Sequence, residues 1–193
     1  MATSPRVLVI SGPSGAGKGT LIGRALPAFP AIAVAVSATT RTQRPGERDG
    51  FEYHFMRPEE FSAAVSAGEF LEHVEYAGNR YGTLRREIDR HLNGGHSVIV
   101  EIELEGARSI KRMLPDAVTI FIAPPSMDEL ARRLTDRRTD SDDEIAARLS
   151  VGEREIAAMA EFDRHVVNDD VARAGGELIG IIADVTGIPP KDH

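Results

Sequence analysis

The fold of this chain is decided by the stretch Ser11-Gly12-Pro13-Ser14-Gly15-Ala16-Gly17-Lys18-Gly19-Thr20. An apolar run, residues 7–10 (VLVI), precedes it, and a helix-permitting segment, residues 21–26 (LIGRAL), follows it. Glycines allow backbone turns that a Cβ atom would block, so the loop can wrap an anion with its N–H groups. The dipole of the following helix and the charge of Lys18 favour a phosphate at the same place. This order of elements predicts a phosphate-binding loop rather than a glycine-rich turn with an incidental lysine.

The loop departs from the pattern G-x-x-x-x-G-K-[ST] at one position. Residues 12–18 fit, but Gly19 stands where a hydroxyl is expected, and Thr20 follows one residue later. That hydroxyl usually ligates Mg²⁺ beside the phosphates. We therefore expect Mg²⁺ to be bound mainly through water, with Thr20 and Glu101, an acid at the end of an expected buried strand, as candidate protein ligands. The ending Lys18-Gly19-Thr20 is similar to that of nucleoside monophosphate kinases.

Composition argues against several classes of function. The formal net charge is −7 and the sequence pI is about 5.4, whereas a general nucleic-acid or membrane-surface binder would carry a basic footprint. The chain has no cysteine, so neither a disulfide framework nor a thiolate metal site is possible. Residues 1–6 lack the apolar region of a signal peptide, and no long apolar run suggests a spanning helix. We therefore expect a cytoplasmic protein that binds neither nucleic acid nor a membrane.

Apolar segments alternate with helix-like segments over much of the chain. This alternation predicts a parallel, three-layer α/β core. After the first strand, the expected buried strands are residues 32–36, 97–102, 118–123 and 165–167.

The composition shifts at Ser37, where the chain becomes rich in Thr, Arg, Gly and Glu. We interpret residues 37–95 as an insert of short strands and helices on the main sheet. Within it the pattern predicts a helix over residues 58–67, a strand over 70–76, a turn over 77–82 and a helix through residue 92 that Thr83 caps.

A second candidate phosphate site lies in this insert. Arg41 and Arg44 are three residues apart in a polar loop beside Ser37, with Tyr53 and Tyr81 further along. Arginine forks match phosphate oxygens, and tyrosine hydroxyls add donors. Two loop arginines alone are more often a solvated surface, but a chain with a phosphate-binding loop needs a second phosphate site if it acts as a kinase on a phosphorylated acceptor.

Six segments closely resemble guanylate kinases. They are residues 37–47 (SATTRTQRPGE), 50–53 (GFEY), 70–72 (FLE), 78–83 (GNRYGT), 121–126 (FIAPPS) and 167–170 (VNDD). The resemblance covers about residues 7–182 and implies a three-layer P-loop NTPase fold with a parallel central sheet. It also implies three parts. These are a nucleotide-binding core (1–36, 96–125 and 164–193), a mixed α+β GMP-binding insert (37–95) and a helical lid (126–163).

The resemblance implies roles for individual residues as well. Residues 12–20 and Asn168 would bind ATP. The GMP phosphate would be held by Arg41, Arg44, Tyr53 and Tyr81, and the guanine would be met by Ser37, Glu72, Thr83 and Glu103. Arg137 and Arg148 of the lid would reach the transferring phosphate, with Arg133 and Arg138 as weaker candidates. The family usually has Asp where Glu103 stands and an amide where Glu105 stands.

The chemistry of guanine agrees with the role implied for Glu72. Guanine presents N1–H and an exocyclic amine side by side, so one carboxylate accepts both. Adenine has no N1 donor, so the carboxylate would stay unpaired, and sites of this kind reject the wrong partner strongly.

These expectations combine into an ATP:GMP phosphotransferase that makes ADP and GDP, with Mg²⁺ accompanying ATP and dGMP as a further acceptor. No general base is needed, because a phosphate monoester with a second pKa near ~6 is largely dianionic at neutral pH. Two alternatives stay open. One is a kinase of the same frame with a phosphorylated sugar as acceptor. The other is a guanylate-kinase-like module that binds phosphopeptides without catalysis.

Overall fold

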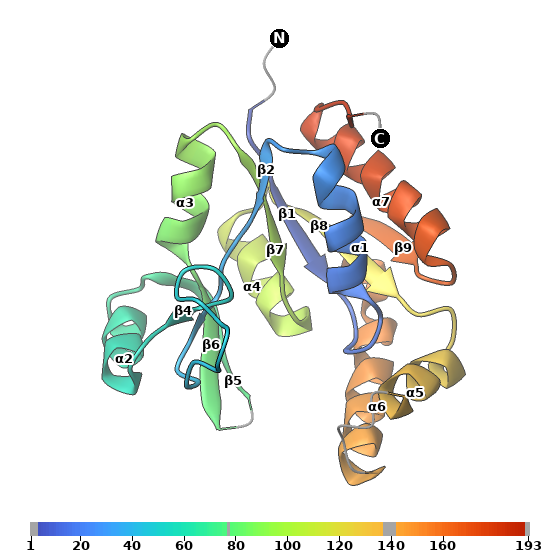
Figure 1. Cartoon of the computed structure of the whole chain (residues 1–193), viewed down its shortest axis with the longest axis horizontal. Helices are drawn as coiled ribbons and strands as arrows, with labels where there is room; N and C mark the ends of the chain where they lie inside the picture. The colour runs from blue at the N-terminus through green and yellow to red at the C-terminus, as the bar shows by residue number, and fades with distance from the viewer. Residues whose placement is uncertain (1–3, 77, 137–141, 192–193) are drawn as a thin grey trace.

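A five-stranded sheet forms the centre of the molecule, with strand order β2-β7-β1-β8-β9 (Figure 1). The structure is a computed structural model that describes residues 4–76, 78–136 and 142–191. The strands are β1 (Val7–Ser11), β2 (Ile32–Val34), β7 (Ser97–Glu101), β8 (Val118–Ala123) and β9 (Arg164–Val167). Every neighbouring pair is parallel. All five residues of β1 are buried, as expected for a strand covered on both faces.

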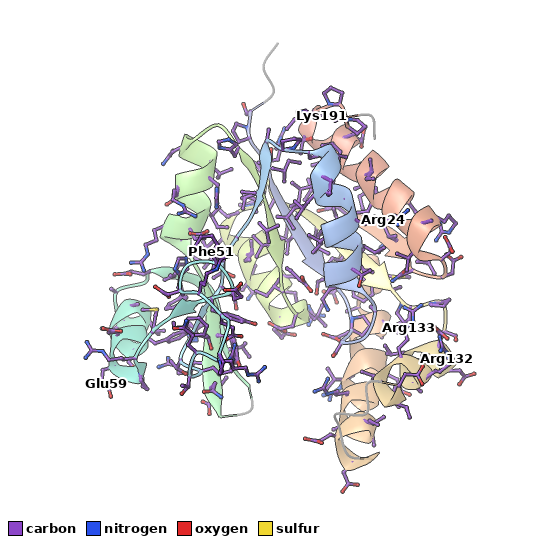
Figure 2. All side chains as sticks on the ribbon, in the orientation of Figure 1. Arg24, Phe51, Glu59, Arg132, Arg133 and Lys191 are labelled. Carbon is purple, nitrogen blue, oxygen red and sulfur yellow. The ribbon has the colours of Figure 1, made fainter. Side chains whose placement is uncertain are left out.

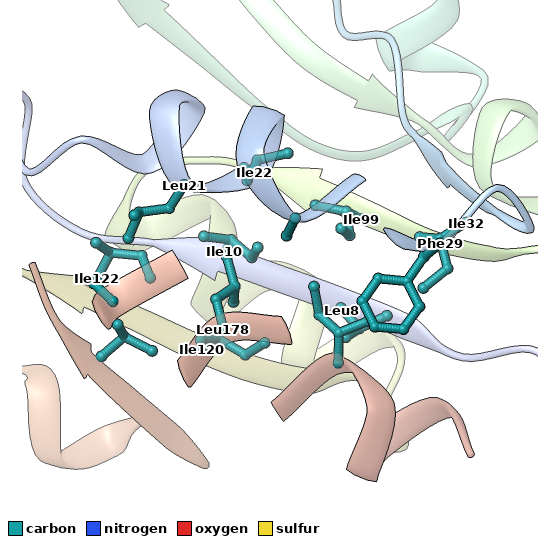
Figure 3. Close-up of a cluster of buried hydrophobic side chains, with 14 of the residues drawn as sticks. Leu8, Ile10, Leu21, Ile22, Phe29, Ile32, Ile99, Ile120, Ile122 and Leu178 are labelled. Carbon is teal, nitrogen blue, oxygen red and sulfur yellow. The ribbon is translucent and has the colours of Figure 1, made fainter. Parts of the chain in front are cut away.

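Helices cover both faces of this sheet. On one face, α1 (Lys18–Ala25) and α7 (Val171–Thr186) pack on Leu8 and Ile10 through Leu21 and Leu178 (Figure 3). On the other face, α3 (Arg85–Asn93) and α4 (Leu104–Met113) pack on the alternate β1 residues, such as Val9. Side chains alternate between the two faces along a strand, so β1 contributes side chains to both apolar clusters. The parallel three-layer core predicted from the sequence is confirmed.

A second sheet of four strands lies beside the first, with strand order β4-β3-β6-β5 (Figure 1). Its strands are β3 (Ala38–Thr39), β4 (His54–Phe55), β5 (Phe70–Tyr76) and β6 (Asn79–Leu84). Helix α2 (Pro58–Ser66) packs against it, and Phe61 of α2 stacks on Phe70 of β5 with ring centroids 4.4 Å apart. This small separate apolar cluster gives the insert a core of its own.

Two details of the insert differ from the sequence-based expectation. The expected turn over residues 77–82 and the helix capped by Thr83 are wrong in their placement, and residue 77 lies outside the described residues. Residues from Asn79 to Leu84 form β6, whose ladder places Thr83 opposite Glu72. Thr83 therefore belongs to the sheet, and α3 begins only at Arg85 after the extended Leu84. The antiparallel ladder satisfies backbone groups over six residues, which a local capping preference does not offset.

The remaining helices follow β8. They are α5 (Met127–Thr135) and α6 (Asp142–Ala157). Short 3-10 turns lie at Leu26–Ala28, directly after α1, and at Met159–Glu161, after α6. Ser126 begins α5 by accepting a hydrogen bond from the backbone N–H of Glu129 at 3.1 Å, as N-cap residues do. Among the helices described, none combines the length and apolar character that crossing a bilayer requires.

Candidate active site

The loop between β1 and α1 is fixed by close backbone contacts at two glycines. Gly12 has φ +142°, and a Cβ there would lie 2.1 Å from the carbonyl oxygen of Ile122 on β8. Gly17 has φ +90°, and a Cβ there would lie 2.4 Å from the Asn168 side-chain nitrogen. Only glycine combines the positive φ with such an approach. The loop is therefore pressed against the carboxyl ends of β8 and β9.

Lys18 bends back over this loop. Its Nζ donates to the carbonyl oxygens of Gly12 at 2.6 Å and Pro13 at 3.3 Å. The ammonium group borders a cavity of about 320 Å³ at the N-terminus of α1. The lining residues are Ser14, Gly15, Gly17, Lys18, Gly19, Thr20 and Glu101. An anion in this cavity would meet the lysine charge together with the positive end of the helix dipole.

Asn168 and Arg133 brace the loop from behind. Asn168 is buried after β9, and its Nδ2 donates to the carbonyl oxygen of Ala16 at 2.7 Å. Arg133 of α5 donates to the carbonyl oxygens of Asn168 at 2.8 Å and Ala16 at 3.4 Å. Oδ1 of Asn168 is buried with no hydrogen-bond partner among the described residues, a cost of about 1–3 kcal/mol. Asn168 thus supports the loop backbone, in addition to its predicted place near the adenine of ATP.

Three of the side chains predicted to hold the acceptor phosphate, those of Arg41, Tyr53 and Tyr81, lie together. The Arg41 guanidinium is 5.3 Å from the centroid of the Tyr53 ring, and the rings of Tyr53 and Tyr81 are 5.9 Å apart. Arg41 donates to Oε1 of Glu47 at 2.7 Å, and the backbone N–H of Arg44 donates to Oε2 at 2.8 Å. The Glu47 carboxylate raises the pKa of Arg41. Burial raises the pKa of Tyr53, so its hydroxyl keeps a proton to donate at neutral pH.

Glu72 and Thr83 are cross-strand neighbours on β5 and β6. Both are buried. Burial raises the pKa of Glu72 to about 7, and the Glu103 carboxylate acts in the same direction. The Thr83 hydroxyl is buried and makes no hydrogen bond of ordinary geometry in the described part of the chain, but its proximity to the Glu72 carboxylate offsets part of the effect of burial on that pKa. A cavity of about 410 Å³ brings Glu72 together with Ser37, Tyr53, Tyr81 and Glu103. Such a site suits a ligand that offers the carboxylate adjacent N–H donors.

One cleft connects the two ends of this arrangement. A cavity of about 640 Å³ shares Lys18 and Glu101 with the loop cavity, and Ser37, Tyr53 and Glu103 with the cavity around Glu72. Phe51, which is 63% exposed, borders it from the insert (Figure 2). The cleft therefore runs from the phosphate-binding loop to the buried carboxyl on the second sheet.

Comparison with known proteins identifies the family. The family model described as guanylate kinase matches residues 4–184. The chain belongs to the guanylate kinase family. It is 52% identical to the guanylate kinase of Rubrobacter xylanophilus, with 92% of this chain and 93% of that protein covered. It is 49% identical to the guanylate kinase of Frankia casuarinae, with 90% and 95% covered.

Solved structures agree with this assignment. The crystal structure of guanylate kinase from Anaplasma phagocytophilum superposes with a TM-score of 0.74 at 32% identity, covering 94% of this chain and 86% of that chain. Shikimate kinase from Bacteroides thetaiotaomicron has a TM-score of 0.51 at 15% identity, covering 95% and 99%, which is a likeness of fold alone. The chain is thus a guanylate kinase family member over nearly its whole length.

Glu103 and Glu105 depart from the family pattern, and the structure gives them different surroundings. Glu103 is the N-cap of α4, and its carboxylate accepts from the backbone N–H groups of Glu105 at 2.7 Å and Gly106 at 2.5 Å. The same side chain borders the cleft. Glu105 is exposed and pairs with Arg108 at 2.5 Å. Glu103 therefore holds a helix terminus beside the site, whereas Glu105 serves a surface ion pair.

The structure describes some but not all of the arginines predicted to lie in a lid. Arg137, like Arg138, lies outside the described residues. Arg148 of α6 donates to the Ser14 hydroxyl at 3.4 Å, a long contact that places it over the phosphate-binding loop. Arg133 lies on the side of α5 nearer the sheet, while Arg132 lies on the outer side (Figure 2).

Oxygen donors for a divalent metal lie at the loop cavity. Thr20 and Glu101 both border it, and a Cβ at Gly19 would be 3.6 Å from Oε2 of Glu101. The Glu101 carboxylate therefore lies directly beside Gly19 at the start of α1. Hard divalent cations prefer such oxygen ligands and retain several waters. Across residues 4–76, 78–136 and 142–191, no cluster of three or more acidic or histidine side chains could hold a metal alone.

Two acids near these groups were not singled out by sequence reasoning. Glu47 forms an ion pair with Arg41. In the sequence, Glu47 stands out only as the last residue of the segment 37–47 that resembles guanylate kinases. Glu155 is buried on α6; burial raises its pKa, while the positive charge of Lys18 opposes this shift. An acid directly before the apolar Ile156 is the only sequence signal for Glu155.

Proposed function

We propose that this chain transfers the γ-phosphoryl group of ATP to GMP, giving ADP and GDP, and that dGMP serves as a further acceptor. The observation that carries the proposal is the continuous cleft between Lys18 and Glu72. It joins a phosphate-binding loop to a buried carboxyl that suits guanine. The proposal includes the division of the chain into a core (1–36, 96–125 and 164–193), a GMP-binding insert (37–95) and a lid (126–163), in a cytoplasmic protein.

Catalysis in this proposal is alignment and charge neutralisation. The GMP phosphate is largely dianionic at neutral pH, since its second pKa is near ~6, so the acceptor oxygen needs no base. Lys18 and the loop N–H groups hold the phosphates of ATP. Arg41, Arg44 and the hydroxyls of Tyr53 and Tyr81 hold the acceptor phosphate. Holding the two anions in line lowers the entropic and electrostatic parts of the activation barrier.

Guanine is selected at the far end of the cleft. The Glu72 carboxylate accepts from N1–H and the exocyclic amine, while Thr83 and Ser37 offer hydroxyls. Arg148 and Arg137 of the lid approach the transferring group. Closing the lid excludes water that would otherwise hydrolyse ATP.

Mg²⁺ is the metal we propose for this reaction. Thr20 and Glu101 would hold it, mainly through water, since their oxygens border the loop cavity. The bound ion supplies charge neutralisation on the phosphates of ATP.

Neither alternative is favoured. A sugar-phosphate kinase would have no use for a buried carboxyl at Glu72 beside Thr83. A phosphopeptide-binding module has no need of a glycine loop that closes around Lys18. Both alternatives also fit the family assignment less well.

The test is ADP production from Mg-ATP with GMP, dGMP, AMP, CMP, UMP and ribose phosphates offered separately. Turnover with GMP, and more slowly with dGMP, supports the proposal. Turnover with a ribose phosphate but not with GMP would favour the sugar-phosphate alternative. A folded sample that turns over none of them and binds no ATP or ADP would favour the binding module.

A further inference from the structure

Glu87 of α3 is a buried acid that the proposed reaction does not use. Its side chain is 4% exposed, and it is not among the residues that border the cleft. Four groups donate to its carboxylate. They are the backbone N–H of Val36 at 3.3 Å, Nε2 of His54 at 3.3 Å, Nε2 of His91 at 3.2 Å and Nη2 of Arg90 at 2.9 Å.

Two of these partners come from outside α3, and each is next to a residue of the acceptor site. Val36 precedes Ser37, and His54 follows Tyr53. The two segments are also joined directly, because the backbone N–H of His54 donates to the carbonyl oxygen of Ser37 at 2.9 Å. One carboxylate therefore holds the neighbours of two cleft residues at once.

The contacts of Glu87 lie where the chain passes between the two sheets. The chain leaves the central sheet after β2, passes Val36 and enters the second sheet at β3. It returns from β6 through α3 to β7 of the central sheet, and α3 lies beside this junction in Figure 1. Glu87 thus joins three segments: the link from β2 to β3, the link from β6 to β7, and β4.

The Glu87 carboxylate is suited to a fixed link. Burial alone would raise its pKa, but hydrogen bonds from Val36, His54 and His91 and the charge of Arg90 outweigh burial and lower it. The group is therefore ionised at neutral pH, and charge-assisted hydrogen bonds are stronger than neutral ones. Its removal would leave the Val36 N–H without this acceptor.

We propose that Glu87 is a positioning residue for the acceptor nucleotide. By holding Val36 and His54, it fixes Ser37 and Tyr53 at the separation from Glu72 that GMP requires. This inference rests on the proposed function, because the positioned ligand is GMP. The four groups that contact Glu87 lie in the insert and at its junction with the central sheet, so we expect the effect to fall on the acceptor and to spare ATP.

The experiment compares Glu87→Gln with Glu69→Gln in the full chain. Glu69 also pairs with α3, through Arg86 at 3.9 Å on the exposed surface, so it is a matched control. We expect Glu87→Gln to raise KM for GMP about tenfold and to leave KM for ATP within about twofold. Glu69→Gln should change neither constant.

Two further readouts separate positioning from a general loss of stability. Amide hydrogen exchange at Val36 should accelerate in Glu87→Gln, while exchange in β1 stays slow. At position 54, His54→Gln keeps a donor in the place of Nε2 and should retain most of the GMP affinity that His54→Leu loses.

The outcomes distinguish this inference from the function beneath it. Wild-type protein that phosphorylates no GMP would overturn the proposed function and the inference together. Active wild-type protein whose KM for GMP is unchanged in Glu87→Gln would overturn the inference alone. Equal rises in both KM values would do the same, since they indicate a structural role without selectivity for the acceptor.

Discussion

The two ends of the cleft are built in different ways. At the end proposed to bind ATP (the ATP end), backbone atoms and glycines set the geometry, with Gly12 against Ile122 and Gly17 against Asn168, beside the fully buried β1. At the end proposed to bind GMP (the GMP end), strands β3 and β4 are two residues long, and side-chain contacts such as Arg41 with Glu47 set the geometry. The ATP end therefore depends on backbone positions that accept few substitutions, whereas the GMP end depends on charged side chains that substitutions can change.

Removing the positive charge of Lys18 from the phosphate-binding loop should have the largest effect. We expect Lys18→Ala to lower kcat about 10³-fold, in the range measured for loss of a preorganised charge-stabilising donor. The melting temperature should stay close to that of the wild type, because the lysine side chain is only partly buried and donates to two carbonyl oxygens of its own loop. Steady-state ADP production and thermal melting measure both. Lys191→Ala, at the far end of the molecule (Figure 2), is the control, and wild-type-like turnover of Lys18→Ala would falsify the mechanism.

The GMP end should respond selectively rather than globally. Glu72→Gln turns one acceptor oxygen into a donor that faces the guanine donors. We expect kcat/KM for GMP to fall about 100-fold, which corresponds to roughly 3 kcal/mol, while KM for ATP stays unchanged. Glu75→Gln, on the same strand but exposed, should leave both constants alone. Equal losses for both substrates would show that Glu72 does not select guanine.

Glu72→Gln should also change how the stability of the protein depends on pH in the absence of substrate. The pKa of Glu72 is about 7, above its ordinary value of 4.5. Between these pH values the folded state keeps a proton that the unfolded chain releases, so the free energy of unfolding falls as pH rises to about 7 and then levels off. Glutamine carries no such penalty. We expect Glu72→Gln to be more stable than the wild type by about 1–3 kcal/mol at pH 8 and to lose most of this advantage at pH 5.

Urea unfolding of both proteins at pH 5 and pH 8 measures this difference. An advantage of Glu72→Gln that is equal at the two pH values would mean that ionisation of the buried carboxyl is not its source. A variant less stable than the wild type at pH 8 would mean that the carboxylate is satisfied in the folded protein.

Much of this architecture could be predicted from the sequence because local signals and tertiary structure agree there. The apolar run before Gly12 forms β1, and the glycine spacing of the loop matches its positive φ angles. Thr83 is the opposite case. Its local preference favours a helix cap, but the ladder with β5 places it opposite Glu72, and a partner 11 residues away is not visible to a local pattern.

The residues of the candidate site also differ in whether a local sequence pattern could identify them. Residues such as Arg41 and Glu72 stand in motifs, and the cleft brings their neighbours together. Glu87 belongs to none of the motifs. Its proposed role depends on contacts with Val36 and His54, which are distant in sequence, so no local pattern could reveal it. The ionisation state of Glu72 could not be predicted from the sequence either, because its pKa depends on how deeply the side chain is buried.

The smallest predicted effect compares adjacent arginines of α5. Arg133 contacts the carbonyl oxygens of Asn168 and Ala16 behind the phosphate-binding loop. Arg132 pairs only with Glu129 and Asp136 at the surface among the described residues, and exposed pairs contribute about 0–1 kcal/mol. We expect Arg133→Ala to raise KM for ATP about fivefold, from the loss of hydrogen bonds worth roughly 1 kcal/mol. Arg132→Ala should change it less than twofold.

Equilibrium binding of ATP and of GMP to both variants measures this difference without turnover. A loss confined to ATP in Arg133→Ala would mean that the support of the ATP end extends from the glycines to the base of the lid. A matching loss of GMP affinity would mean that the two ends are coupled through α5. Equal effects of the two substitutions would mean that the support of the loop depends on helix α5 as a whole and not on the hydrogen bonds of Arg133.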